Sequence, residues 1–332
     1  MSTFEARYDH IPEGHTVVSM RSGGGGSWAA EHRLIERYGR DRVTGLFTDV
    51  KGSDGNPHTG EDEDTYRFLR DIEPDLGNEF IYLQDGRDIW DVFLLPAVGW
   101  LGNSRLAHCS WYLKTLPARG WLDEHRDPAT TWISVGMDWT ETNRHAGVYK
   151  NYAHIVDGCA DPRLCRGLFT RDGRLPGPGC KNLLAQPWRV LMPMNERPKV
   201  AKPQVLLLMR ERGIRPPRMY EQGFAHANCP ACVKGGKAHW KNLWETKPET
   251  YLYAERREQE FRDSRPSRAN ASILKDRHGG TANSLSLREF RLTLPARAQD
   301  VQEAFELEYD LGGCGCANEA SPAELALTGG AA

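Results

Sequence analysis

The sequence predicts an α/β protein built on a doubly wound, mostly parallel five-stranded sheet, with a helical region that bears cysteines toward the C-terminus. Over the first 140 residues, short apolar runs alternate with amphipathic stretches, as parallel strands alternate with crossover helices. Four consecutive glycines directly follow the first apolar run, and a Cys-Pro-Ala-Cys motif lies well after the alternation ends.

The predicted strands are short runs of mostly apolar residues, which is typical of strands buried on both faces of a sheet. They are expected at residues 16–20, 42–50, 78–86, 130–139 and 187–194. The predicted helices cover residues 27–39, 61–72 and 201–214, and residues 88–101 are expected to form a helix or a loop with a helix. The first helix ends at Gly39, and the second begins with acidic residues, which the helix dipole favours at an N-terminus.

The chain divides into four predicted regions. Residues 1–147 form an α/β core that carries the glycine turn, and residues 148–187 form an insertion rich in Gly, Pro, Arg and Cys. Residues 188–316 return to the core and continue into the cysteine-containing region. Residues 317–332 are small and mostly uncharged, and are expected to be a disordered tail.

Composition argues against several classes of protein. The net charge is −2, so the chain lacks the basic excess of a dedicated nucleic-acid binder. This balance does not exclude a local basic groove. No stretch approaches the roughly 18–20 apolar residues of a membrane span, so no membrane partner is expected. The N-terminal residues carry no apolar signal region, and the predicted location is cytoplasmic.

Residues 22–27, Ser-Gly-Gly-Gly-Gly-Ser, form the predicted turn between the first strand and the first helix. Backbone N–H groups of such a turn, together with the start of the helix, can hold a phosphate. Ser22 and Ser27 would add hydroxyl groups, and Ser27 could also cap the helix. The turn lacks the ending of a P-loop and the glycine spacing of a dinucleotide fold. It indicates a phosphate site of another kind, with a purely structural tight turn as the alternative.

The turn resembles the S-G-G-x-D-S/T loop of the PP-loop ATP pyrophosphatases and, more narrowly, of their PAPS-reductase-like relatives in phages and bacteria. The resemblance continues, in order, through "LFTDVKGSD", "NSRLAHCSWYLKTLP", "GMDWTETNRH" and "MYEQGFAHANCPACVKGGKAHW". Together these motifs run from about residue 16 to 316. The resemblance implies an adenine nucleotide α-hydrolase-like (HUP) fold with a nucleotide-binding core in residues 1–147.

The resemblance also implies a bound adenine nucleotide, ATP or a relative, and Mg²⁺. The cofactor-binding residues would be Ser22, Gly23, Gly24, Gly25, Gly26 and Ser27 around the phosphates, with Asp49 and Arg105. Asp49 would accept from ribose or adenine or hold a metal, and Arg105 would pair with phosphate or sulfate oxygens.

Two basic residues would have catalytic roles under the same resemblance. Lys114 and Arg144 would neutralise phosphate or sulfate oxygens during the reaction. The alternatives are a solvated helix position for Lys114 and an ion pair with Glu141 for Arg144.

One residue departs from the family pattern. Gly26 stands where the PP-loop has Asp, whose carboxylate could help to arrange a magnesium ion. The departure puts cleavage between the α- and β-phosphates of ATP in question, or moves the metal to Asp49, Asp54 or Glu61.

The cysteines suggest a metal site or sulfur chemistry. Cys229 and Cys232 form a C-x-x-C pair, and cytosolic cysteines grouped in this way often bind metal or do redox chemistry. A [4Fe–4S] cluster needs four thiolates, which Cys109, Cys229, Cys232 and Cys314 would supply, with Cys316 or Cys180 as alternatives to the last. Zinc would satisfy the same spacing.

Cys314 and Cys316 have a second predicted role, as catalytic cysteines. A cysteine near the C-terminus could carry a persulfide or attack a sulfur, as the terminal cysteine of the related reductases does. The segment nevertheless lacks the Glu-Cys-Gly-Leu-His ending of sulfonucleotide reductases, and Cys109 is followed by Ser110 rather than by a second cysteine.

The leading functional prediction is ATP-dependent adenylation of a substrate, followed by sulfur transfer to, or modification of, a nucleic acid or a small molecule. An iron–sulfur cluster would assist it. The alternatives are an APS or PAPS reductase and a non-catalytic nucleotide-binding protein. The expected partners are an adenine nucleotide and the acceptor, and a homo-oligomer is left open.

Overall fold

The computed structural model describes residues 11–96, 98–101, 108–137, 139, 188–227, 229–278 and 281–294. Its main sheet has five strands in the order β3-β2-β1-β4-β5, and every neighbouring pair is parallel. The strands are β1 (Thr16–Arg21), β2 (Val43–Asp49), β3 (Glu79–Gln84), β4 (Thr131–Val135) and β5 (Arg189–Leu191). The α/β class and the doubly wound parallel sheet are confirmed. The predicted insertion and tail lie outside the described residues.

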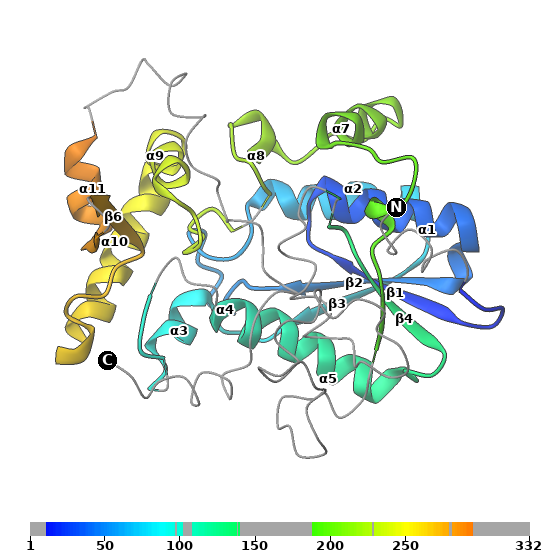
Figure 1. Cartoon of the computed structure of the whole chain (residues 1–332), viewed down its shortest axis with the longest axis horizontal. Helices are drawn as coiled ribbons and strands as arrows, with labels where there is room; N and C mark the ends of the chain where they lie inside the picture. The colour runs from blue at the N-terminus through cyan, green and yellow to red at the C-terminus, as the bar shows by residue number, and fades with distance from the viewer. Residues whose placement is uncertain are drawn as a thin grey trace.

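Helices cover both faces of the sheet (Figure 1). One face carries α1 (Gly25–Tyr38), α2 (Glu63–Leu76) and α7 (Lys202–Glu211), and the other carries α5 (Leu116–His125). Adjacent residues of β2 show why two cores form. Phe47 packs with the first group and Leu46 with α5, because successive side chains of a strand point to opposite faces.

Two of the elements differ from the sequence prediction. Of residues 88–101, predicted as a helix or a loop with a helix, the described part forms the short helix α3 (Ile89–Leu94), since Pro96 disfavours helical geometry at the residue before it. A helical segment absent from the prediction comprises α4 (His108–Ser110), a π-helical turn (Trp111–Thr115) and α5. Short 3₁₀ helices lie at Arg40–Arg42, Pro193–Asn195 and Pro266–Arg268.

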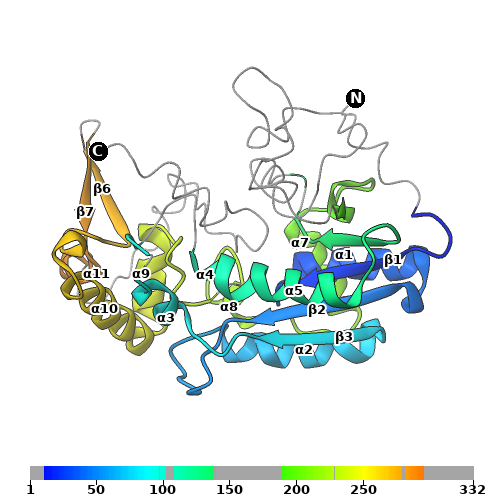
Figure 2. The same cartoon turned by 90° about the horizontal axis from the view of Figure 1, so that it is seen from below.

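Residues 215–294 form a second part of the molecule, named here the Cys module. It contains α8 (Arg218–Glu221), α9 (Lys237–Thr246), α10 (Pro248–Asp263), β6 (Leu274–His278), β7 (Thr281–Leu285) and α11 (Leu287–Thr293). Figure 2 shows α9, α10, α11, β6 and β7 grouped to the side of the sheet. α8 lies between this group and the sheet. The module has its own apolar cluster, which includes the fully buried Trp240, Tyr251 and Phe261 and extends to α3.

The antiparallel hairpin β6–β7 was not predicted. Its strands read Leu-Lys-Asp-Arg-His and Thr-Ala-Asn-Ser-Leu, so they lack the alternation of apolar residues that marks a strand. Leu274 is buried, at the open end of the hairpin where it pairs with Leu285 and where the chain turns into α11. None of the helices in the described ranges has the length and apolar character required to span a membrane.

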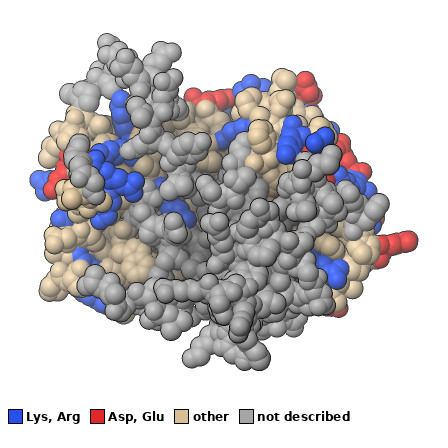
Figure 3. Space-filling model, in the orientation of Figure 1, with Lys and Arg blue, Asp and Glu red and all other residues tan. Residues whose placement is uncertain are grey.

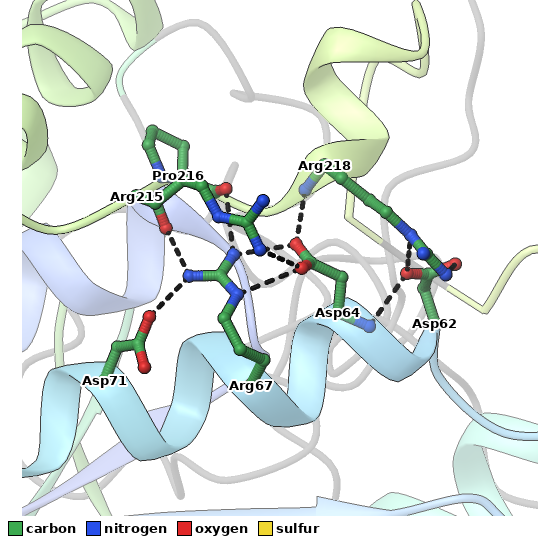
Figure 4. A network of polar contacts seen from close by, with 7 residues as sticks. All are labelled: Asp62, Asp64, Arg67, Asp71, Arg215, Pro216 and Arg218. Carbon is green, nitrogen blue, oxygen red and sulfur yellow. Dashed lines mark hydrogen bonds and ion pairs between the residues drawn. The ribbon is translucent and has the colours of Figure 1, made fainter.

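A network of ion pairs attaches the Cys module to α2 (Figure 4). Asp64 accepts hydrogen bonds from the guanidinium groups of Arg67 and Arg215 and from the N–H of Arg218. Asp62 accepts two hydrogen bonds from the Arg218 guanidinium, at 2.7 and 3.0 Å. The start of α2 therefore fixes the position of α8 relative to the sheet.

Candidate functional site

The glycine turn lies at the point of the sheet where ligands of open α/β folds bind. The chain leaves β1 toward β2 on one side, whereas β4 lies on the other side of β1 and leads to β5. The order of strands therefore reverses between β1 and β4, and the crevice at their carboxyl ends is the usual binding site. Residues 22–24 directly follow β1, and Gly136 directly follows β4.

The conformation of the turn explains its glycines. Gly23 has a φ of +72°, and a Cβ on it would lie 2.3 Å from the methyl carbon of Thr65 on α2. Thr65 is fully buried, and its hydroxyl has no hydrogen-bond partner within the described part of the chain. A side chain at position 23 would strain the backbone and force α2 away from the turn.

Ser27 organises the turn but does not cap the helix, contrary to the prediction. The N-cap residue is Gly24, which has no side chain to accept a hydrogen bond. The Ser27 hydroxyl lies inside the first turn of α1, where it donates to the Gly24 carbonyl at 2.9 Å and accepts from the Ser22 N–H at 3.1 Å. These contacts hold the turn in one conformation.

The structure gives a physical reason for Gly26, the residue that departs from the family pattern. A Cβ on Gly26 would lie 2.8 Å from the carbonyl oxygen of Gly136. A Cβ on Gly136 would in turn lie 2.5 Å from the Cα of Ser27. The start of α1 and the end of β4 therefore approach so closely that a carboxylate at position 26 would require them to separate.

Asp49, at the end of β2, is held by two tyrosines. Tyr66 donates to its Oδ1 at 2.7 Å, Tyr82 donates to its Oδ2, and the Lys51 N–H also reaches Oδ1. Burial and the adjacent Asp49 carboxylate raise the pKa of both tyrosines, so both remain proton donors at neutral pH. The predicted contact between Asp49 and a nucleotide or metal stays a prediction.

Lys114 is buried and ion-paired, which excludes the solvated position considered for it. Its Nζ lies 2.8 Å from Oε1 of Glu61, and the two side chains are 8% and 0% exposed. Lys114 belongs to the π-helical turn between α4 and α5. Such turns are often found at functional sites because they redirect a side chain.

The Cys module lies directly on the glycine turn. The Gly25 N–H donates to the Tyr220 hydroxyl at 3.1 Å. A Cβ on Gly24 would lie 3.1 Å from that oxygen and 3.9 Å from the Cβ of Ala227. Since Ala227 is two residues before Cys229, the structure brings the predicted phosphate site and the predicted cysteine site into one region.

The loop with Cys229 and Cys232 is ordered by a histidine. A ring nitrogen of His239 lies 2.8 Å from the carbonyl oxygen of Pro230, between the two cysteines. Gly235 lies beneath this ring, and a Cβ there would be 2.3 Å from it. Both cysteines are half-buried thiols. His239 therefore orders the loop through this hydrogen bond, and the ring nitrogen that makes it is not a third metal ligand beside the two cysteines.

The cysteines do not make a metal site within the described part of the chain. Cys109 is also a half-buried thiol, and it packs with Cys229 against the apolar cluster of the Cys module. Among the described residues, no group of three His, Cys, Asp or Glu side chains is arranged to hold a metal ion. Among these residues, the four ligands of a [4Fe–4S] cluster or of a structural zinc site are therefore not assembled.

Several predicted site residues lie outside the described residues, namely Arg105, Arg144, Cys180, Cys314 and Cys316. The roles predicted for them stay predictions. Trp188 and Trp240 are buried core residues.

Sequence reasoning missed the tyrosines that contact Asp49 and the glycine turn. Tyr66, Tyr82 and Tyr220 come from three separate elements, and no local pattern connects them with Asp49 or the glycines. Tyr66 follows the acidic start of α2, and Tyr220 is the second residue of the motif that begins at Met219. Those positions are the only signal in the sequence that could have indicated them.

No protein-family model matches the chain, and no curated protein matches it. Among solved structures, it is similar to the U34-tRNA thiolase NcsA from Methanococcus maripaludis with its [4Fe-4S] cluster. The two chains are 14% identical, with a TM-score of 0.41, over 78% of this chain and 75% of that chain. At so low a TM-score the likeness adds nothing to the strand order, from which the fold class follows.

Proposed function

We propose that the chain is a PP-loop-type enzyme that binds ATP at the glycine turn and transfers adenylate to an acceptor, with sulfur transfer to that acceptor as the next reaction. The observation that carries the proposal is the position of the turn. It joins β1 to α1 where the strand order reverses, and the Cys module lies against it.

The turn has the chemistry that a triphosphate requires. Its backbone packs closely against other elements at Gly23 and Gly26, so the turn carries no side chain there. The N–H groups at the start of α1, which have no partner within the helix, are the natural donors to phosphate oxygens. In adenylation, an oxygen of the acceptor attacks the α-phosphorus and pyrophosphate leaves. Fixed N–H donors stabilise the charge that develops on the phosphate oxygens in the transition state.

The adjacent thiols support sulfur transfer as the following step. Residues that contact the turn lead within a few positions to Cys229 and Cys232. In that step a sulfane-sulfur donor would first convert one cysteine to a persulfide, whose outer sulfur attacks the adenylated carbon of the acceptor as AMP leaves. The second cysteine would then cleave the resulting S–S bond and release the thiolated acceptor, and an external thiol would reduce the Cys229–Cys232 disulfide that forms. The roles of Lys114, Arg105, Arg144, Cys314 and Cys316 belong to this proposal.

The acceptor that we propose is a nucleic acid, with a small molecule as the alternative. Figure 3 shows Lys and Arg side chains gathered on the left of this face, over the part that contains α9, α10 and α11. Lys275 and Arg277 are exposed on the same face of β6, opposite the small residues Ser284 and Ala282 of β7. A basic surface with small neighbours is suited to a phosphate backbone.

Calorimetric titration of the full chain with ATP, AMP and pyrophosphate tests the phosphate site. We expect ATP and pyrophosphate to bind more tightly than AMP. Ser22→Ala should weaken ATP binding about tenfold, the effect of one hydrogen bond to a charged oxygen. Ser53→Ala, an exposed serine outside the turn, is the control and should bind like the unaltered protein. Equal binding by Ser22→Ala would contradict the proposal.

The nearness of thiols to the turn also favours the second candidate, an APS or PAPS reductase. The two reactions leave different products. Adenylation releases pyrophosphate from ATP when the acceptor is present, whereas a reductase releases sulfite from APS or PAPS and requires a thiol reductant. ATP binding with neither product would indicate a nucleotide-binding protein without this chemistry.

Metal analysis after anaerobic purification tests the predicted cofactor separately. About four irons per chain that are lost in Cys229→Ala would support an iron–sulfur cluster. Stoichiometric zinc would make the site structural. A metal-free protein would remove the predicted cluster without affecting the phosphate site.

A further inference from the structure

The hydroxyl of Tyr220 accepts a hydrogen bond from a backbone group that a bound phosphate would use. Gly25 is the first residue of α1, so its N–H is one of those at the helix start that have no partner within the helix. It donates to Tyr220 Oη at 3.1 Å. Since the N–H groups at a helix start are those that bind phosphate oxygens, the tyrosine and a phosphate oxygen compete for the same donor.

The surroundings of Tyr220 hold its backbone but leave its side chain room to move. The preceding residues are fixed, because Arg218 pairs with Asp62 and Met219 is fully buried in the apolar cluster of the Cys module. The Tyr220 side chain itself is only half-buried, with Lys202 Nζ 4.4 Å from the centre of its ring. A ligand at Gly25 can therefore displace the ring without moving α8.

The residues after Tyr220 return to the same turn before they reach the cysteines. Ala227 would be 3.9 Å from a Cβ on Gly24, on the side of the turn where Tyr220 Oη lies. Gly223, between the two contacts, has a φ of +81°, so the chain reverses there to bring Ala227 back. A phosphate bound on the turn would meet both Tyr220 and the segment that leads into Cys229.

We infer that Tyr220 belongs to the phosphate site as a residue contributed by the Cys module. A phosphate oxygen at Gly25 displaces its hydroxyl, and the displacement changes the exposure of Cys229 and Cys232. The inference rests on the proposed function, since it takes the glycine turn as the phosphate site. It adds to that function a competition between Tyr220 Oη and a phosphate oxygen for the Gly25 N–H. It also adds a physical link between nucleotide binding and the thiols.

The test compares the full-length protein with Tyr220→Phe, which keeps the ring and removes only the hydroxyl. Two quantities are measured, the Kd for ATP and pyrophosphate, and the rate at which iodoacetamide alkylates Cys229 and Cys232, followed by mass spectrometry of the peptide. Tyr253→Phe, a half-buried tyrosine on α10, is the control.

Tyr220→Phe should bind both ligands about three- to tenfold more tightly, the effect of one competing hydrogen bond. ATP should change the alkylation rate in the unaltered protein and in Tyr253→Phe, and should change it less in Tyr220→Phe, because without its hydroxyl the ring is not held at Gly25 before ATP binds. A thermal melt like that of the unaltered protein shows that the variant is folded.

The other outcomes overturn the inference in distinguishable ways. If the unaltered protein binds ATP and Tyr220→Phe binds it equally or more weakly, the inference fails and the proposed function stands. If ATP leaves the alkylation rate of the unaltered protein unchanged, the link to the thiols fails. If no variant binds ATP or pyrophosphate, the inference and the proposed phosphate site fail together.

Discussion

The main sheet and the Cys module bury their polar groups in different ways. All of β2 is buried, and its backbone polar groups pair with β1 and β3 in a regular ladder. In the Cys module, buried side chains rather than a neighbouring strand make the hydrogen bonds to some of the backbone groups. Glu258 accepts from the N–H groups of Ile273 and Leu287, and Arg268 donates to the carbonyls of Leu95 and Val98. A ladder shares its stability among many bonds, whereas the module depends on a few side chains that single substitutions can remove.

The largest effect should come from Asp62, which joins the two regions. Its carboxylate is 2% exposed and contacts the Arg218 guanidinium, the Lys247 Nζ at 2.6 Å and the Asp64 N–H. Burial raises its pKa, but the hydrogen bonds from Arg218 and Lys247 outweigh this effect and lower it overall. Asp62→Ala should reduce the free energy of unfolding by about 2–4 kcal/mol, because α2 loses its N-cap and two cations lose a buried partner, although the 41% exposed Arg218 can turn to water. Urea denaturation measures this loss.

Asp71→Ala is the matched control for that substitution. Asp71 lies on the same helix and pairs with Arg67 at 2.6 Å, but its side chain is 42% exposed. An exposed pair of this kind contributes at most about 0.5 kcal/mol. Similar losses for the two variants would mean that Asp62 does not attach the module to the sheet.

The next effect concerns pH and the buried carboxyl group of the Cys module. Burial raises the pKa of Glu258 from its ordinary 4.5 to about 7, although the two N–H groups that it accepts from lower it. A carboxyl whose pKa is higher in the folded state stabilises the fold fully below its unfolded pKa and loses this contribution as the pH rises toward and through 7. Its contribution should fall by about 2–3 kcal/mol between pH 4 and 7.

Glu258→Gln tests this contribution because glutamine cannot ionise. The difference in unfolding free energy between the variant and the unaltered protein should depend on pH over that window. Glu249→Gln, at an exposed position of α10, should give a difference that is nearly constant. A constant difference for Glu258→Gln would show that this carboxyl does not titrate there.

The same contrast explains how much could be predicted from the sequence. The strands of the main sheet were predictable, because each is a mostly apolar run that alternates with a helix along the chain. β2, which is buried along its whole length, is the clearest case, whereas β3 at the edge has no buried residue. The turn at residues 22–27 could be located for the same reason. The contacts that complete the site could not, since Tyr220 meets Gly25 across 195 positions of the chain. Only the packing of the Cys module onto α2 brings these residues together.

The smallest effect separates two helical glycines, one packed against a neighbouring element and one exposed. Gly26 lies against Gly136, whereas Gly120 on α5 has nothing within 4 Å of where a Cβ would be. Gly120→Ala should stabilise the protein by about 0.5–1 kcal/mol, because alanine favours a helix interior.

Gly26→Ala should gain the same helix preference and lose more to overpacking, for a net loss of about 1–2 kcal/mol. Gly26→Asp should lose at least as much as Gly26→Ala, because its larger side chain meets the same carbonyl oxygen. Thermal or urea unfolding of the three variants measures these differences. If Gly26→Asp were as stable as the unaltered protein, α1 and β4 could separate at little cost. The glycine at this position would then need an explanation other than their close approach.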